Sequence, residues 1–105
     1  MKVIFRRVLK EPLKGDIVAV FPCERADADG NMLSYMRIGQ HSACTPEFIV
    51  EDTAPSSTSR DRHGDMKEHL ENDVGYTELE VVENIEEATK LIGSCFKNKK
   101  EYENE

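Results

Sequence analysis

The sequence lacks any apolar stretch long enough to cross a membrane. Its longest uninterrupted apolar run, residues 17–21, falls far short of the ~20 residues that a transmembrane helix requires. The N-terminus alternates apolar residues with Lys2, Arg6 and Arg7, and it has no apolar core of the kind found in secretory signal peptides. We therefore expect a cytoplasmic protein with no membrane partner.

Cysteine is also scarce, and its spacing matches no common cysteine framework. Cys23, Cys44 and Cys95 are odd in number, lie far apart and contain no C-x-x-C pair. Disulfide-rich domains pair their cysteines, and structural zinc sites use closely spaced ligand pairs. A zinc site would have to combine ligands that this spacing does not favour: Cys23, His41, Cys44 and either His63 or His69. We therefore expect neither a disulfide framework nor a metal site.

Basic residues are outnumbered by acidic ones. The chain has 14 Lys and Arg against 21 Asp and Glu, which gives a formal net charge of −7. Binding to a phosphate backbone needs clustered Lys and Arg, so we expect no direct contact with nucleic acid. No GxGxxG or P-loop pattern is present to hold a nucleotide, and we expect no cofactor. An acidic surface still suits a basic partner.

The length and the residue patterns predict one α+β domain. A chain of 105 residues fits a single domain, expected over residues 1–97, with a charged, frayed tail at 98–105. The patterns predict the order β-β-β-β-α-β-α, with strands at 2–9, 16–21, 32–38, 47–51 and 76–82 and helices at 65–74 and 85–96. The segment 52–64 is expected to be a loop. We predict a two-layer sandwich, an antiparallel or mixed sheet of about five strands with both helices on one face.

Two segments carry most of this prediction. Residues 16–21 are apolar on both faces, which predicts a central strand that pairs antiparallel with the first strand across a short link. Asn84 is expected to cap the last helix, with Glu87 three residues later. The apolar residues of that helix fall within an arc of roughly 140°: Ile85, Ala88, Leu91, Ile92, Cys95 and Phe96. We expect this helix to lie across the sheet over residues 17–21.

The helix at 65–74 is predicted from its ends and from one apolar stripe. Asp65 and Glu68 resemble a capping box at its start. Met66, Leu70 and Val74 recur at a spacing of four residues, which indicates a narrow apolar face. We expect Gly75, directly after the stripe, to adopt the left-handed conformation that ends many helices.

Chemically versatile side chains are densest in the segment 34–44 (SYMRIGQHSAC). They are Tyr35, Arg37, Gln40, His41, Ser42 and Cys44. At this segment the chain resembles a group of short bacterial and phage-encoded proteins of unknown function. The resemblance covers about the first half of the chain, through KVIFR at 2–6, DIVAVFP at 16–22 and SYM-x-IGQH at 34–41. It implies a small intracellular protein, with a mobile genetic element as one source, and it carries over no activity, ligand or site.

The same segment supports two chemical hypotheses. Tyr35, Arg37, Gln40 and His41 are candidates for binding a small ligand, and His41 with Cys44 for a catalytic thiolate–imidazolium pair. No third residue that would orient such a pair is identifiable, and catalytic Cys–His pairs usually join distant segments. The plainer interpretation, a loop histidine near a half-buried cysteine, is favoured.

Acidic residues gather around the last predicted strand and the start of the last helix. They are Glu78, Glu80, Glu83, Glu86 and Glu87. Carboxylates stabilise helix N-termini and charge runs are usually solvated, so a solvated face is the favoured interpretation. The functional alternative is an acidic surface that mimics nucleic acid and occupies the cleft of a host protein.

These patterns favour a non-catalytic function. The small fold, the one-sided charge and the lack of a complete catalytic set predict an interaction or accessory protein that binds another protein or itself. Two alternatives stay open. One is a small-ligand binder or enzyme with its site in segment 34–44, and the other is the acidic inhibitor that mimics nucleic acid.

Overall fold

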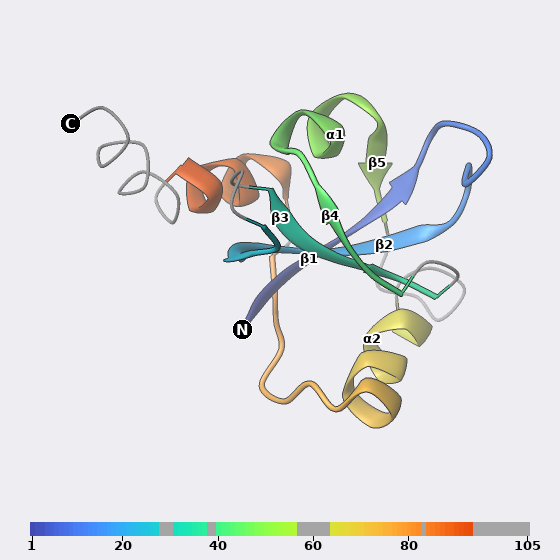
Figure 1. The fold of residues 1–105 in the computed structure, drawn as a ribbon, viewed down its shortest axis with the longest axis vertical. Helices are drawn as coiled ribbons and strands as arrows, with labels where there is room; N and C mark the ends of the chain where they lie inside the picture. The colour runs from blue at the N-terminus through green and yellow to red at the C-terminus, as the bar shows by residue number, and fades with distance from the viewer. Residues whose placement is uncertain (28–30, 38–39, 57–63, 83, 94–105) are drawn as a thin grey trace.

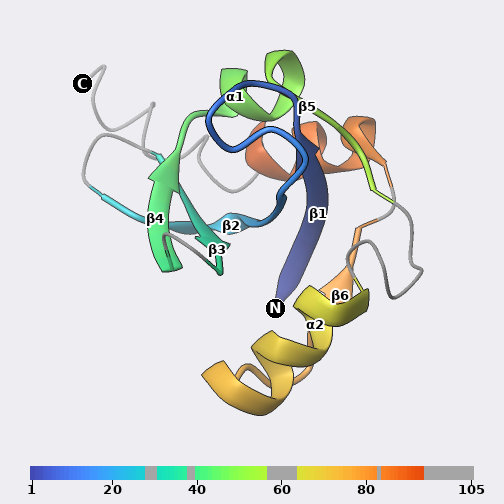
Figure 2. The ribbon, with the colours of Figure 1, turned by 90° about the vertical axis from the view of Figure 1, so that its right-hand side faces the viewer.

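The centre of the fold is a β-hairpin. In a computed structural model, which describes residues 1–27, 31–37, 40–56, 64–82 and 84–93, strands β1 (Lys2–Val8) and β2 (Ile17–Arg25) pair antiparallel. Strands β3 (Met32–Met36) and β4 (Gln40–Cys44) extend this meander, so that the sheet runs β4-β3-β2-β1-β5. Figure 1 shows this meander and β5. The strand β6 (Glu80–Val81), which is labelled in Figure 2, pairs with β1 in parallel and makes the sheet mixed. The expected α+β class, mixed sheet and central hairpin are confirmed.

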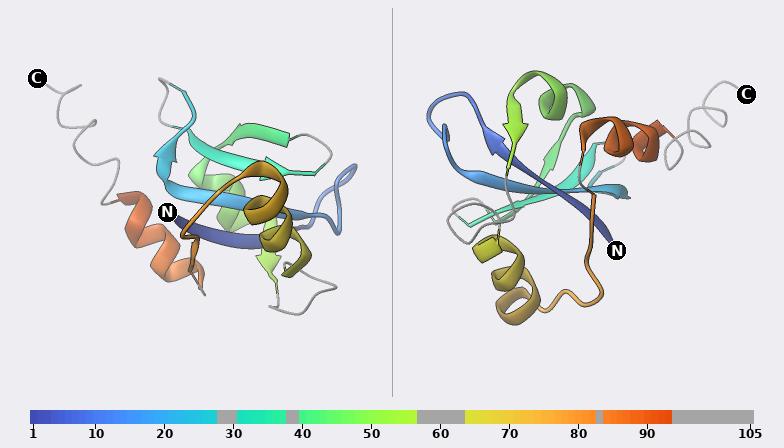
Figure 3. Two further views of the ribbon diagram at one scale, coloured as in Figure 1. Left: turned by 90° about the horizontal axis from the view of Figure 1, so that it is seen from below. Right: turned by 180° about the vertical axis from the view of Figure 1, so that it is seen from behind.

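The helices cover both faces of the sheet. One apolar core joins β1 and β2 to helix α1 (Pro46–Glu51) and to the helical residues 85–93, through side chains that include Ile4, Val18, Val20, Ile49 and Ala88. The opposite face packs on helix α2 (Asp65–His69) and the following π-helical turn η2 (Leu70–Val74), through Val3, Phe5, Phe21, Met66 and Leu70. Figures 2 and 3 show the sheet between these two layers.

This arrangement corrects the expected placement of the helices. Two helices do share one face, but they are α1 and residues 85–93, whereas the predicted helix at 65–74 lies on the other face. The physical reason is already present in the hairpin: successive side chains of a strand point to opposite faces, and β1 and β2 are apolar on both. A sheet with two apolar faces must bury both of them.

The segment 47–51, predicted as a strand, belongs instead to α1, and that prediction is wrong. The Thr45 hydroxyl accepts a hydrogen bond of 3.1 Å from the backbone N–H of Phe48, which is the bond of a helix N-cap. Pro46 then occupies the first helical position, where its missing N–H costs nothing. These two start signals outweigh the β-branched residues Ile49 and Val50 that suggested a strand.

Strand assignments around α1 and near β6 also differ from the sequence prediction. Residues 40–44 form β4, which was not predicted, and β5 (Thr53–Pro55) lies within the expected loop 52–64. Of the predicted strand at 76–82, only Glu80–Val81 pairs in the sheet. The expected tail 98–105, and Cys95 and Phe96 of the predicted last helix, lie outside the described residues.

The described part of the last helix follows the predicted pattern. The Asn84 side chain accepts a 2.8 Å hydrogen bond from the backbone N–H of Glu87, so Asn84 caps the helix as expected. Ala88 is fully buried, and Ile85, Leu91 and Ile92 pack against the same core as Val18 and Val20 of β2. This part of the helix therefore lies across the central strand, as the sequence predicts.

The other predicted helix agrees in extent but not in its N-terminal capping. Met66 and Leu70 are buried against the sheet and Val74 packs beside them, which confirms the apolar stripe. Gly75 has a φ of 97° and ends the segment in the left-handed conformation. Gly64, not Asp65, holds the N-cap position, and no side-chain capping bond forms there.

Among the described helices, none is long and apolar enough to cross a membrane. Cys23 is disulfide-bonded and Cys44 is a free thiol, so the cysteine spacing was a poor guide to pairing. Disulfide partners are set by the distance between them in the fold, which the spacing does not reveal.

Candidate functional site

Tyr35 and His41, both predicted as candidates, lie side by side on one face of the sheet. They are cross-strand partners in β3 and β4, and their ring centroids are 5.0 Å apart in an edge-on arrangement. Tyr35 is only 4% exposed, whereas His41 is exposed at the end of the sheet. The strand register therefore brings part of segment 34–44 together as a pair of rings, one buried and one facing solvent.

Three more rings extend this pair into a continuous row. The ring of Tyr35 lies 5.6 Å from that of His69, and the ring of His41 lies 5.9 Å from that of Tyr76. Tyr76 in turn stacks on Phe21 of β2 at 5.0 Å. We call these five side chains the ring row. It connects three strands of the sheet with α2 and with the segment that follows η2.

Two hydrogen bonds between tyrosine and histidine hold the ring row together. The Tyr35 hydroxyl lies 2.8 Å from His69 Nε2, and the Tyr76 hydroxyl lies 2.8 Å from His41 Nε2. On the far side of its ring, His69 Nδ1 lies 2.8 Å from a carboxylate oxygen of Asp73. A carboxylate only accepts hydrogen bonds, so Nδ1 carries a proton, and in the neutral form of the ring Nε2 accepts from Tyr35.

Arg37, the third predicted candidate, lies at an open polar hollow next to the ring row. The hollow has a volume of about 290 Å³ and is lined by Arg37, Asp65, Glu68, His69, Asn72 and Asp73. The Arg37 guanidinium donates a long hydrogen bond of 3.4 Å to the backbone carbonyl of Asp65. Because the hollow is open and polar, a small molecule would bury little apolar surface there.

Cys44 does not share a site with His41. The two residues are three apart on β4, and side chains at odd spacings point to opposite faces of a strand. Cys44 packs against the core on the α1 face, whereas His41 contacts Tyr35 and Tyr76 on the α2 face. Burial raises the pKa of the Cys44 thiol to about 11, with a hydrogen bond to Ser34 opposing the shift. The thiol is therefore protonated near neutral pH and is a poor nucleophile.

The two remaining candidates from the sequence, Gln40 and Ser42, also lie on β4. Gln40 begins β4, and its side chain lies outside the described part of the chain. Ser42 is exposed on the same strand. Within the described ranges, no three His, Cys, Asp or Glu side chains are grouped so that they could hold a metal ion. The sulfur of Cys23 is committed to its disulfide bond.

Asp73 and Tyr76 were not predicted from the sequence, and His69 was predicted only as a candidate zinc ligand. One signal was available, because His69 and Asp73 are four residues apart within a predicted helix and such residues are neighbours on its surface. Tyr76 gave no comparable signal, since it follows the helix and reaches His41 across 35 residues of sequence. Only the packing of α2 on the sheet brings these groups together.

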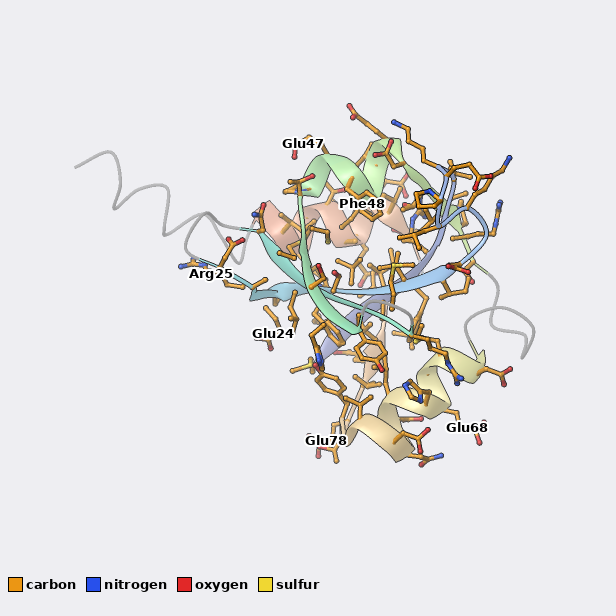
Figure 4. The ribbon with its side chains drawn as sticks, turned by 45° about the vertical axis from the view of Figure 1, so that its right-hand side comes forward. Glu24, Arg25, Glu47, Phe48, Glu68 and Glu78 are labelled. Atoms are coloured by element: carbon orange, nitrogen blue, oxygen red, sulfur yellow. The ribbon has the colours of Figure 1, made fainter. Side chains whose placement is uncertain are left out.

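Carboxylates surround the ring row. Burial, and next the charge of Glu24, raise the pKa of the Tyr76 hydroxyl, which places Glu24 within electrostatic range of that ring. Figure 4 shows Glu24, Glu68 and Glu78 around the region where β4 comes close to α2 and η2. The only arginine or lysine lining the adjacent hollow, among the described residues, is Arg37. Among the residues that the structure describes, the charges around the ring row are therefore mainly acidic.

The acidic residues predicted as a possible mimic of nucleic acid do not form one uniform surface. Glu80 pairs with Lys2 at 2.8 Å, which neutralises part of its charge. Glu78 is exposed with a φ of 55°, and Glu86 and Glu87 are exposed on the last helix. Glu83 lies outside the described residues.

The ring row ends at the free edge of the sheet. β4 is the last strand in the order β4-β3-β2-β1-β5, and none of the described residues pairs with its outer side. His41, Ser42 and Ala43 are exposed along this strand. None of the five residues of β4 is Asp, Glu, Lys or Arg, although these four types make up 33% of the residues in the chain. Natural edge strands are often protected by Lys or Pro, and β4 has neither.

Comparisons with known proteins add no further information about this site. No protein-family model matches the chain, and no curated protein or solved structure matches it either.

Proposed function

We propose that this chain is a non-catalytic binding protein that recognises another polypeptide through the free edge of β4 and the adjoining ring row. The observation that carries the proposal is that exposed, uncharged edge residues and an aromatic cluster meet at the same place. An extended peptide can add to such an edge through main-chain hydrogen bonds, while neighbouring side chains select its sequence.

The chemistry of the site supports binding over catalysis. Tyr35 is buried and its hydroxyl is bonded to His69. Both ring nitrogens of His69 have partners within the protein. Cys44 has a raised pKa and lies on the other face. A group that is to transfer a proton to a substrate must be within hydrogen-bond reach of it, and these groups would first have to leave their present partners.

The edge can be tested with proline substitutions. In an antiparallel strand, the N–H groups of successive residues point alternately to the two sides, so Ser42→Pro and Ala43→Pro should differ. One removes an N–H that bonds β3 and disrupts the sheet, and the other removes an N–H from the free edge. The variant that keeps the wild-type circular dichroism spectrum and melting temperature is the edge variant.

The binding experiment compares four proteins in cross-linking and affinity capture from the cells that naturally contain the chain. Wild type should retain a partner, the edge variant and His41→Ala should lose it, and the matched surface variant Glu47→Gln on α1 should keep it. Figure 4 shows Glu47 on α1, on the other side of the sheet from α2. A wild-type protein that stays monomeric and captures nothing, or capture that is equal in all four proteins, would overturn the proposal.

A further inference from the structure

We infer that the polypeptide bound at β4 is an extended segment that carries a lysine or arginine side chain on the face of the ring row. This inference rests on the proposed function and names the chemical class of its partner. It follows from the direction of the side chains along β4, from the exposure of its rings and from the charges around them.

The direction of the side chains decides what a partner strand would meet. Side chains alternate between the two faces of a strand, and those of a paired strand lie beside their cross-strand neighbours. His41 and Ala43 of β4 are on the face of α2, because His41 contacts both Tyr35 and Tyr76 there. Every second side chain of an added strand would therefore lie on the face of the ring row, and the one paired with His41 would lie next to its ring.

The exposed end of the ring row suits a cation. His41 is exposed and Tyr76 is half-buried, so both side chains are accessible in part to a partner. The face of a tyrosine ring such as that of Tyr76 carries partial negative charge and attracts Lys and Arg side chains. The small side chain of Ala43, on the same face of β4, leaves room for a long aliphatic stem to lie along the strand.

The charges around the rings favour the same partner. Glu24 acts electrostatically on Tyr76, and Asp73 and Glu68 line the adjacent hollow. Of the nearby bases, Arg37 donates to the carbonyl of Asp65 at the start of α2, and Arg25 lies beyond Glu24, farther from α2, in Figure 4. The whole chain carries a net charge of −7. An acidic segment would be repelled by these charges, whereas a basic one would be attracted.

The inference is tested by titrating the full-length ¹⁵N-labelled protein with three acetylated and amidated heptapeptides, TKTKTKT, TQTQTQT and TETETET. The basic peptide should bind with the highest affinity and should shift the amide resonances of residues 40–44 and of Tyr76 most strongly. Its affinity should fall as NaCl is added, because exposed charge pairs are screened by salt.

Single variants locate the cation. Glu24→Gln and His41→Leu should each weaken the binding of TKTKTKT about twofold to fivefold, which is the size of an exposed cation–π or ion-pair contact. Glu47→Gln on α1 changes the net charge by the same amount as Glu24→Gln and should leave the affinity unchanged. The proline variant that stays folded but lacks an N–H group at the free edge should bind all three peptides more weakly at β4.

The outcomes separate this inference from the function on which it rests. Equal affinity for the basic and neutral peptides, with shifts at β4, would refute the basic partner and leave edge binding intact. Shifts from TKTKTKT that centre on α1 or on residues 85–93 would overturn the location. Absence of binding by all three peptides at millimolar concentration would overturn the inference, and the capture experiment would then decide the proposed function independently.

Discussion

The replacement Thr53→Val tests how a buried cation is accommodated beneath α1. Arg6 is 6% exposed and Thr53 is 4% exposed. The Arg6 guanidinium donates from Nε to the Thr53 hydroxyl at 2.9 Å and from Nη2 to the Thr53 carbonyl at 3.1 Å. The Thr53 hydroxyl donates in turn to the backbone carbonyl of Ile49 at the end of α1. One hydroxyl thus connects β1, β5 and α1.

The magnitude follows from these bonds. Valine has nearly the shape of threonine, so the variant opens no cavity and removes only the hydroxyl. It leaves a charged donor of Arg6 and the carbonyl of Ile49 without this partner, and we expect a loss of about 2–4 kcal/mol in the free energy of unfolding. That is a large fraction of the ~5–15 kcal/mol that stabilises a typical domain. The hydrogen bond from the Arg6 side chain to the main-chain carbonyl of Thr53 should remain.

Urea denaturation followed by circular dichroism measures this loss. The control is Thr77→Val at an exposed position, which should change the free energy of unfolding by less than about 0.5 kcal/mol. In the background of Arg6→Met, Thr53→Val should cost at least about 1 kcal/mol less than in wild type, because no charged donor is left unpaired. A loss below about 0.5 kcal/mol in the single variant, or additive losses in the double variant, would refute the reasoning.

Three further outcomes are expected. Leu70→Ala should lower the free energy of unfolding by about 2–5 kcal/mol in urea denaturation, because the Leu70 side chain is fully buried between η2 and the sheet. The control Val50→Ala, at a 58% exposed position, should change the free energy of unfolding little. With a pKa of about 11, about one part in a thousand of the Cys44 thiol is ionised at pH 8. Alkylation of Cys44 by iodoacetamide should therefore be far slower than in the urea-unfolded protein, and its rate should rise up to about pH 11. Rapid reaction at pH 7 would contradict this. The hydrogen bond and charge of Lys2 lower the pKa of Glu80 from its ordinary value of 4.5. The stability that this ion pair contributes is therefore present above pH 4.5 and is lost as the pH falls through the lowered pKa. Glu80→Gln should lower the melting temperature at pH 7 but not at pH 2.

The hairpin and the last helix could be predicted from the sequence because their local patterns agree with their packing. Residues 17–21 are apolar on both faces and belong to the central strand β2, and Asn84 caps the helix that covers it. In α1 the two kinds of signal disagreed: β-branched side chains favoured a strand, while Thr45 and Pro46 favoured a helix start, and the capping bond prevailed. Where local signals conflict, packing on the sheet decides.

The candidate site could be predicted only where it is local in sequence. Tyr35 and His41 lie within one predicted segment and meet because β3 and β4 form a hairpin. Their hydrogen-bond partners His69 and Tyr76 come from 34 and 35 residues away, respectively, and no spacing rule connects them. These two contacts form only because α2 covers the face of the sheet that carries Tyr35 and His41. The expectation that both predicted helices share one face was wrong.

The two tyrosine–histidine bonds give the proposed binding edge a rigid support. β4 is an edge strand and has a neighbour on one side only among the described residues. The bond between Tyr76 and His41 fixes the start of β4 to the segment after η2, and the bond between Tyr35 and His69 fixes β3 to α2. Each contributes about 0.5–1.5 kcal/mol, and together they hold the edge and the acidic hollow in one geometry. A partner strand would therefore meet a preformed surface and lose less free energy in ordering it.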